Sequence, residues 1–266
     1  MLGGFLNSTS ASPPPSPSSP PSPPSPLSTH PTSPSHPYLS LSPSNPFLIA
    51  FSTTILLSTS YLGYQRFGRR IRNVDELRIP QDLYPKRKYL KGIVTSVGDA
   101  DNFRVWHRPV LRWYENPPKT RSELKGETIH VRLAGVDAPE LAHFGKPAQP
   151  FSSEALDLLT TTLISRPVLV ELYQKDRYNR VVGMCYVRRP WYSLPLPFKK
   201  DNVSELLLKA GLATVYTQGG AVYAGKFERF KELEEKAKKK KLGMWAMSSN
   251  KYESPAEYKK RTAGTS

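Results

Sequence analysis

A short stretch near the middle of the chain carries one cation and two carboxylates, in the order Arg132, Asp137 and Glu140. The residues before it, 128–133, alternate between apolar and polar side chains, which is the pattern of a half-buried strand. Pro139 ends that strand because it has no amide hydrogen to donate. A fixed cation and two acids at the end of a rigid strand could bind a phosphate ester and a metal ion. Taken alone, a surface ion pair is the more ordinary interpretation.

Two further charged turns accompany this stretch. Asp99 and Asp101 lie in an acidic turn between the strand-like residues 89–96 and 102–107. Asp176 and Arg180 flank a second turn, which precedes an apolar run. Each turn alone is equally consistent with an ordinary hairpin, where Asp is common because its side chain bonds its own backbone. Together the three stretches place arginines and carboxylates at strand ends, and guanidinium groups match the geometry of phosphate.

In these three stretches the chain resembles the staphylococcal nuclease (thermonuclease-like) family. The family's motifs appear at residues 99–102, 132–140 and 176–180, in the family's order and spacing, and the resemblance extends over residues 89–247. It implies an α+β fold, in which a five-stranded OB-fold β-barrel carries three helices. The strand-like segments are 89–96, 102–107, 128–134, 167–172 and 180–187, and the helical patterns are 151–164, 203–210 and 226–241.

The chain departs from the family pattern at a few positions. Ala100 and Asn102 stand where the family prefers Gly and Thr, and Asn179 stands where it has Gly. Asn adopts positive φ more readily than most residues, so we expect the turn at Asn179 to keep its shape. Of a pair of nucleotide-binding tyrosines in the family, the chain keeps Tyr216.

The resemblance also implies roles for particular residues. Arg132 and Arg180 match the two catalytic arginine positions and Glu140 the catalytic glutamate position. The implied metal is Ca²⁺, a hard cation that prefers oxygen donors, although Mg²⁺ or Mn²⁺ also binds carboxylates. The implied metal ligands are Asp101, Asp137 and the backbone carbonyl of Ala138. The candidate substrate-binding residues are Arg177, Tyr178 and Tyr216.

Histidine and cysteine do not form a zinc-binding pattern. His107, His130 and His143 are scattered along the chain, and we expect them to be structural. Cys185 is the single cysteine, which excludes an intrachain disulfide, and its apolar surroundings predict a buried thiol instead of a nucleophile.

The charge of the chain is strongly positive and unevenly distributed. The formal net charge is +16, from 38 basic and 22 acidic residues, and no charged side chain precedes Arg66. A region this basic predicts a polyanionic partner, either nucleic acid or an anionic membrane surface. The sequence gives no sign of a protein partner.

The sequence divides into five segments. Residues 1–46 form a Ser/Pro-rich stretch that predicts a disordered tail, and 47–64 form an uncharged transmembrane helix. Arginines follow the helix immediately, which favours placing the rest of the chain on the inner side of the membrane, the cytoplasmic or matrix side. Residues 65–88 are predicted as a basic linker, 89–247 as the nuclease-like domain and 248–266 as a polar C-terminal tail.

These features predict a membrane-anchored, calcium-dependent endonuclease of DNA, RNA or both. With its tail, span and linker, the chain is similar to the fungal mitochondrial endonucleases of the long-chronological-lifespan class, which implies a mitochondrial membrane. One alternative is a catalytically weak nucleic-acid-binding scaffold of the same fold, and another is an adaptor whose basic linker binds anionic lipid. The presence of Arg132, Glu140 and Arg180 together favours the enzyme.

Overall fold

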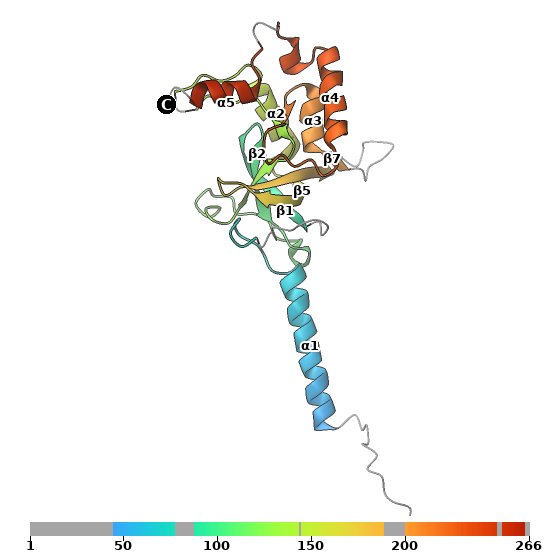
Figure 1. Ribbon diagram of the computed structural model, residues 1–266. Coiled ribbons are helices and arrows are strands. Elements are labelled where there is room, and N and C mark those ends of the chain that lie inside the picture. Colours follow the sequence, from blue (N-terminus) through green and yellow to red (C-terminus); the bar gives the residue numbers. More distant parts are fainter. Residues whose placement is uncertain (1–44, 78–87, 144, 189–199, 249–251, 264–266) are drawn as a thin grey trace, which may run out of the picture. The chain divides into compact units, whose positions relative to one another are not determined.

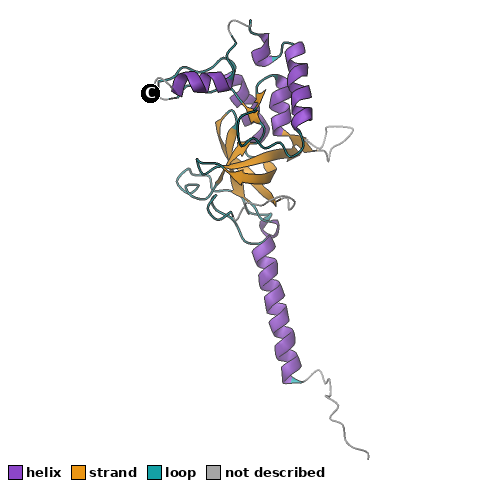
Figure 2. Cartoon of the chain, in the orientation of Figure 1, coloured by secondary structure: helices purple, strands orange, loops and turns teal. Residues whose placement is uncertain are grey.

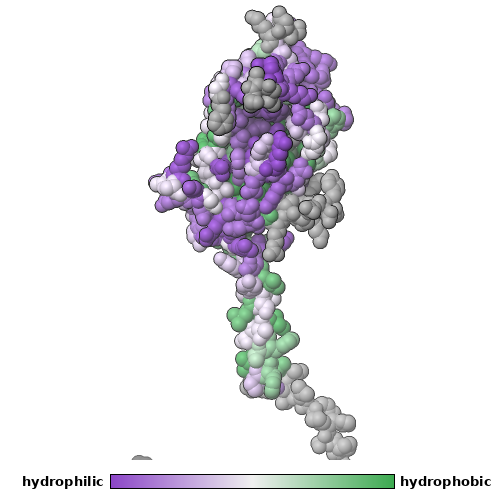
Figure 3. Space-filling model, turned by 60° about the vertical axis from the view of Figure 1, so that its left-hand side comes forward, coloured by the Kyte–Doolittle hydropathy of each residue, from purple (hydrophilic) through white to green (hydrophobic). Residues whose placement is uncertain are grey.

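The computed structural model describes residues 45–77, 88–143, 145–188, 200–248 and 252–263, so most of the predicted tail lies outside the described residues. Helix α1 (Pro46–Phe67) is the one helix among the described residues that is long and apolar enough to cross a membrane. None of its residues is buried, and hydrophobic side chains run along it (Figure 3). The Thr59 hydroxyl donates to the Ile55 carbonyl at 2.8 Å, which satisfies a polar group within the helix.

A closed five-stranded barrel forms the centre of the protein (Figures 1 and 2). Its strands run in the order β3-β2-β1-β5-β6, and a parallel pairing of β3 with β6 closes the sheet. This confirms the predicted OB-like barrel. The five strands are β1 (Lys88–Asp99), β2 (Asn102–His107), β3 (Ile129–Leu133), β5 (Pro167–Lys175) and β6 (Val181–Arg188).

The side chains of β3 show how the barrel separates its core from its site. Ile129, Val131 and Leu133 are fully buried, whereas His130 and Arg132 between them are only half-buried. Because side chains alternate across a strand, packing the three apolar residues into the barrel turns Arg132 to the opposite face. The hydrophobic core therefore fixes the direction of the candidate catalytic arginine.

Three helices cover the barrel, as the sequence predicts. They are α2 (Ser152–Leu163), α3 (Val203–Ala210) and α4 (Phe227–Lys239), of which α3 and α4 lie side by side (Figure 1). Two short strands, β4 (Val136–Asp137) and β8 (Thr214–Val215), pair with each other. Strand β7 (Lys200–Asn202) extends the sheet beside β6. Two single helical turns are η1 (Val110–Arg112) and η2 (Gly243–Ala246).

The segment just before the barrel packs against it instead of forming a free linker. Val74 and Leu77 are buried in the hydrophobic core. The Arg70 guanidinium lies 2.8 Å from the carboxylate of Glu127 and 4.4 Å from the ring centre of Trp106. Residues 65–77 of the predicted basic linker thus include apolar side chains that join the core, and residues 78–87 of it lie outside the described residues.

The C-terminal segment contains a helix that the sequence analysis did not predict. Helix α5 (Pro255–Ala263) lies within the residues expected to be a polar tail. Ser254 and Glu257 cap its start reciprocally, because the Ser254 hydroxyl accepts from the Glu257 amide at 3.2 Å and the Glu257 carboxylate accepts from the Ser254 amide at 2.9 Å. This is a capping box followed by proline at the first helical position, and it is readable in the sequence.

Candidate active site

The turn between β3 and β4 places the acidic residues of the central motif. Gly135 adopts φ 74°, and a Cβ atom there would lie 2.7 Å from the ring of Phe230, so both the backbone conformation and the space require glycine. Beyond the turn, pairing of β4 with β8 holds Asp137 opposite Thr214. A sharp turn packed against a helix thus buries the carboxyl group of Asp137.

Arg132 lies between the two predicted metal-binding aspartates. Its Nε lies 3.4 Å from Asp101 Oδ2, and its Nη2 donates to Asp137 Oδ1 at 3.3 Å. The register of the sheet explains this arrangement, because Arg132 pairs with Asn102, directly after Asp101, across the β2–β3 ladder. Burial alone would lower the pKa of Arg132, but the two carboxylates raise it above its usual value. The guanidinium also stacks on Tyr216, 5.0 Å from the ring centre.

Arg180 is held by the hairpin between β5 and β6. Its Nε donates to Asp176 Oδ2 at 2.7 Å, and the other oxygen of that carboxylate accepts the amides of Tyr178 and Arg180, both at 2.9 Å. Burial would raise the pKa of Asp176, but these bonds lower it. Asn179 adopts φ 56°, which confirms that asparagine preserves the turn.

The two arginines share one pocket, which has a volume of about 410 Å³. Both Arg132 and Arg180 line it, together with all three predicted substrate-binding residues, Arg177, Tyr178 and Tyr216. The Tyr178 ring is 63% exposed, and the guanidiniums of Arg177 and Arg180 lie 4.9 and 5.2 Å from its centre. Asp101, Asp137 and Glu140 do not line the pocket. Arg132 contacts Asp101 and Asp137, and so joins these two aspartates to it.

The predicted metal ligands have donor chemistry that fits a hard cation. Asp137 Oδ2 is buried and has no hydrogen-bond partner, although such an oxygen normally has one. Burial raises the pKa of Asp137, and the nearby cations oppose that shift. In the part of the chain that the structure describes, no three His, Cys, Asp or Glu side chains gather as a metal site. A cation would therefore depend on two carboxylates, a carbonyl and water, which is a shell that Ca²⁺ accepts.

Glu140 lies beside a lysine that the sequence analysis did not include in the site. Lys259 on α5 places its Nζ 2.8 Å from Glu140 Oε1 and 2.7 Å from Asp137 Oδ1. The backbone of Glu140 is held by Gln149, whose side chain accepts the Glu140 amide at 2.9 Å. Arg132 and Glu140 are thus linked through Asp137 and Lys259, and the lysine of this set of charges comes from α5.

His107 and His130 form hydrogen bonds within the fold, and Cys185 is buried. The Ile71 amide donates to His107 Nδ1 at 2.8 Å, and burial lowers the pKa of His107 to about 4. His130 shares a 3.0 Å hydrogen bond with Asn102. Cys185 is fully buried, which raises the pKa of its thiol and makes it a poor nucleophile.

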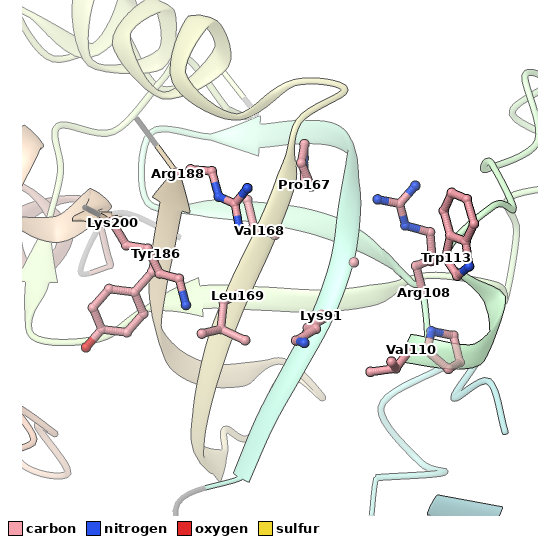
Figure 4. A pocket seen from close by; sticks show the side chains of 12 residues that line it. Lys91, Arg108, Val110, Trp113, Pro167, Val168, Leu169, Tyr186, Arg188 and Lys200 are labelled. Atoms are coloured by element: carbon pink, nitrogen blue, oxygen red, sulfur yellow. The ribbon is translucent and has the colours of Figure 1, made fainter. Parts of the chain in front are cut away.

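A second pocket, of about 430 Å³, lies on the outside of the barrel (Figure 4). Figure 4 shows Lys91 and Leu169 on neighbouring strands, with Tyr186 on one side and Arg108 and Trp113 on the other. Its cations are Lys91, Arg108, Arg188 and Lys200, and no carboxylate is among its lining residues. This pocket has positive charge but lacks the acidic groups that hydrolysis needs.

Comparison with known proteins identifies the chain's relatives. The sequence model described as "Staphylococcal nuclease homologue" matches residues 130–247. The chain is 45% identical over 221 residues to the probable endonuclease LCL3 of Pyricularia oryzae, which covers 81% of each protein. It is 46% identical over 223 residues to the probable endonuclease lcl3 of Sclerotinia sclerotiorum, covering 81% of this chain and 80% of that protein. Barrel, motifs and relatives agree, and the chain belongs to the staphylococcal nuclease homologue family.

Proposed function

We propose that this nuclease hydrolyses phosphodiester bonds of DNA, RNA or both at the pocket of Arg132 and Arg180. The observation that carries the proposal is the position of these two guanidiniums, which come from β3 and from the turn before β6 and line one pocket. Beside that pocket lies the Asp137 and Glu140 cluster, to which Arg132 is bonded. Cations and acids arranged in this way suit the attack of water on a phosphate.

The two arginines would stabilise the charge that develops during attack. As water adds to phosphorus, negative charge grows on the phosphoryl oxygens, and fixed donors lower that barrier most. A guanidinium stays charged and donates two parallel hydrogen bonds to such oxygens. Arg180 is oriented by Asp176 and Arg132 by its two aspartates, so neither must reorganise greatly when substrate binds.

Glu140 would accept the proton of the attacking water. A carboxylate that lies within reach of the attacking water can act as its general base. Gln149 and Lys259 hold the backbone and side chain of Glu140, which fixes the direction of its carboxylate. Asp101, Asp137 and the Ala138 carbonyl would hold Ca²⁺. Such an ion polarises a phosphoryl oxygen and makes bound water more acidic.

Contacts outside the scissile phosphate would bind the rest of the strand. Tyr178 exposes its ring beside Arg177 and Arg180, so a base can stack on it, and stacking does not require a particular sequence. Tyr216 packs against Arg132 and would orient that guanidinium as well as contact substrate. This set of contacts favours a nuclease with little sequence preference.

The proposal includes a membrane anchor. Helix α1 has the length and composition of a span, and Arg66, Arg69 and Arg70 follow near its end. Arginines next to a span favour the inner side of the membrane, so the barrel would lie there. A mitochondrial membrane is the location implied by the resemblance to the fungal endonuclease class.

The test uses the full-length protein in detergent micelles with denatured DNA, in Ca²⁺ or in EGTA. We expect cleavage in Ca²⁺ alone, and a loss of at least ~100-fold in kcat for Glu140→Gln because the general base is removed. Glu154→Gln, an exposed glutamate on α2, is the matched control and should cleave like the unaltered protein. Tight DNA binding without cleavage in any metal would overturn the proposal and favour the scaffold.

A further inference from the structure

The ammonium group of Lys259 joins two carboxylates for which different tasks are proposed. Its Nζ lies 2.7 Å from Oδ1 of Asp137, a proposed metal ligand, and 2.8 Å from Oε1 of Glu140, the proposed base. A lysine side chain carries an ammonium group, and that of Lys259 lies within ion-pair distance of both carboxylates. A lysine 122 residues from Asp137 in the sequence thus reaches the centre of the site.

Helix α5 is packed in a way that fixes Lys259. Tyr258 and Thr262, on either side of it, are buried. The Tyr258 hydroxyl donates to the Pro147 carbonyl at 2.6 Å, and Lys146 Nζ donates to the Thr262 carbonyl at 2.8 Å. These contacts join the helix to the segment that follows Glu140. The packing of α5 therefore fixes where the Lys259 side chain starts and limits where its ammonium can lie.

Gln149 provides a second connection, between the proposed base and the segment that leads into α5. Its side-chain oxygen accepts the Glu140 amide at 2.9 Å, and its side-chain nitrogen donates to the Glu253 carbonyl at 3.3 Å. The Gln149 amide in turn donates to the Glu140 carbonyl at 2.9 Å. Both the backbone and the carboxylate of Glu140 are therefore tied to the C-terminal segment.

The charges around Asp137 differ between its two oxygens. Oδ1 contacts both Lys259 and Arg132, whereas Oδ2 is buried and has no hydrogen-bond partner. Oδ2 is thus left for a metal ion while Oδ1 is held. An ammonium held at Oδ1 would also repel a cation that Oδ2 bound, because like charges in a partly buried site are weakly screened.

We propose that Lys259 is a positioning residue of this nuclease, one that directs Glu140 and at the same time weakens the binding of the divalent cation. The inference rests on the function proposed above, because it assumes that Asp137 ligates the ion and that Glu140 is the base. Lys259 connects the ligand and the base through one ammonium group. Its removal should leave a site that binds Ca²⁺ more tightly but cleaves more slowly.

The experiment compares Lys259→Met with the unaltered full-length protein in detergent micelles. Calorimetric titration with Ca²⁺ should show a Kd roughly tenfold lower for Lys259→Met, since a nearby like charge is removed. Cleavage of denatured DNA at saturating Ca²⁺ should show kcat falling roughly tenfold with KM little changed, because substrate binding is retained and the base is misdirected. Lys259→Arg keeps the charge and should recover part of both effects.

Lys260→Met is the matched control, because Lys260 is exposed on the next position of the same helix. Equal Ca²⁺ affinity in Lys259→Met and Lys260→Met would overturn the inference, and so would tighter Ca²⁺ binding with full kcat. If Lys259→Met fails to fold, as seen by thermal unfolding, the same comparison is made with Lys259→Gln, which also removes the charge. Tighter Ca²⁺ binding with a lower kcat than in Lys260→Met would support the inference, and equality to Lys260→Met in both Kd and kcat would overturn it. Calcium-independent cleavage, or an active Glu140→Gln, would instead reject the proposed function itself.

Discussion

The two pockets of the barrel both carry several cations, but they differ in how those cations are held. In the first pocket, the guanidiniums of Arg132 and Arg180 are each bonded to an aspartate. In the pocket of Figure 4, Lys91 and Arg188 form no ion pair with any carboxylate of the described residues. A guanidinium that is bonded to a carboxylate has a fixed direction, whereas a cation without such a partner attracts anions but does not orient them. The first pocket is therefore suited to catalysis, whereas the second is suited only to attracting anions.

The largest expected effect distinguishes an arginine of each pocket. Arg132→Ala should lower kcat by roughly 10²–10³-fold, because a fixed donor to the phosphoryl oxygens is removed. Arg188→Ala, at the second pocket, should leave kcat unchanged and at most raise KM at low salt. Steady-state cleavage of denatured DNA at two salt concentrations measures both. Similar losses of kcat in the two variants would end the distinction between the pockets.

A smaller effect is expected from the exposed aromatic residue of each pocket. Tyr178→Ala should raise KM about tenfold, since base stacking contributes ~1–3 kcal/mol per base. Trp113 is 73% exposed at the second pocket, and Trp113→Ala should change KM less than Tyr178→Ala. Fluorescence-monitored binding of single-stranded DNA by inactive Glu140→Gln protein isolates this step. A larger effect of Trp113→Ala would show that the single-stranded DNA binds at the second pocket.

The smallest effect on catalysis is expected at His107, which adjoins the second pocket and anchors residues before the barrel through Ile71. Burial lowers its pKa to about 4, below the usual 6.5, so the imidazole takes up a proton more readily after unfolding. Its contribution to stability is therefore complete above pH 6.5 and lost as the pH falls toward 4, by at most about 3 kcal/mol. Denaturant unfolding of His107→Gln should depend less steeply on pH than that of the unaltered protein. Equal slopes would contradict this role.

Much of the barrel could be predicted because its strands obey a simple period. The alternation from Ile129 to Leu133 fixes which side of β3 faces the core, and the turns at Gly135 and Asn179 have residues suited to positive φ. Local signals of this kind depend on neighbours in the sequence. They were sufficient to place Arg132 and Arg180 next to strand ends. The joint role of the two arginines was implied by the family resemblance, and the structure adds that both line one pocket.

What the sequence did not reveal depends on contacts between distant segments. Lys259 reads as one of several surface lysines, and only the docking of α5 brings it to Asp137 and Glu140. The capping box at Ser254 predicts a helix there but not its partner. Glu234 likewise reads as part of the charged face of α4, yet it is buried and accepts the Val215 amide at 3.0 Å.

The long sequence separations at α5 have a consequence for how the protein folds. The contacts of Lys259 with Asp137, of Tyr258 with Pro147 and of Gln149 with Glu253 close loops of 122, 111 and 104 residues. Such closures are slow because the chain entropy is lost before the contact forms. The barrel can therefore assemble before its acidic cluster is complete. In a refolding experiment, nuclease activity should appear after the burial of the barrel's core, and the delay should be the time that α5 needs to dock.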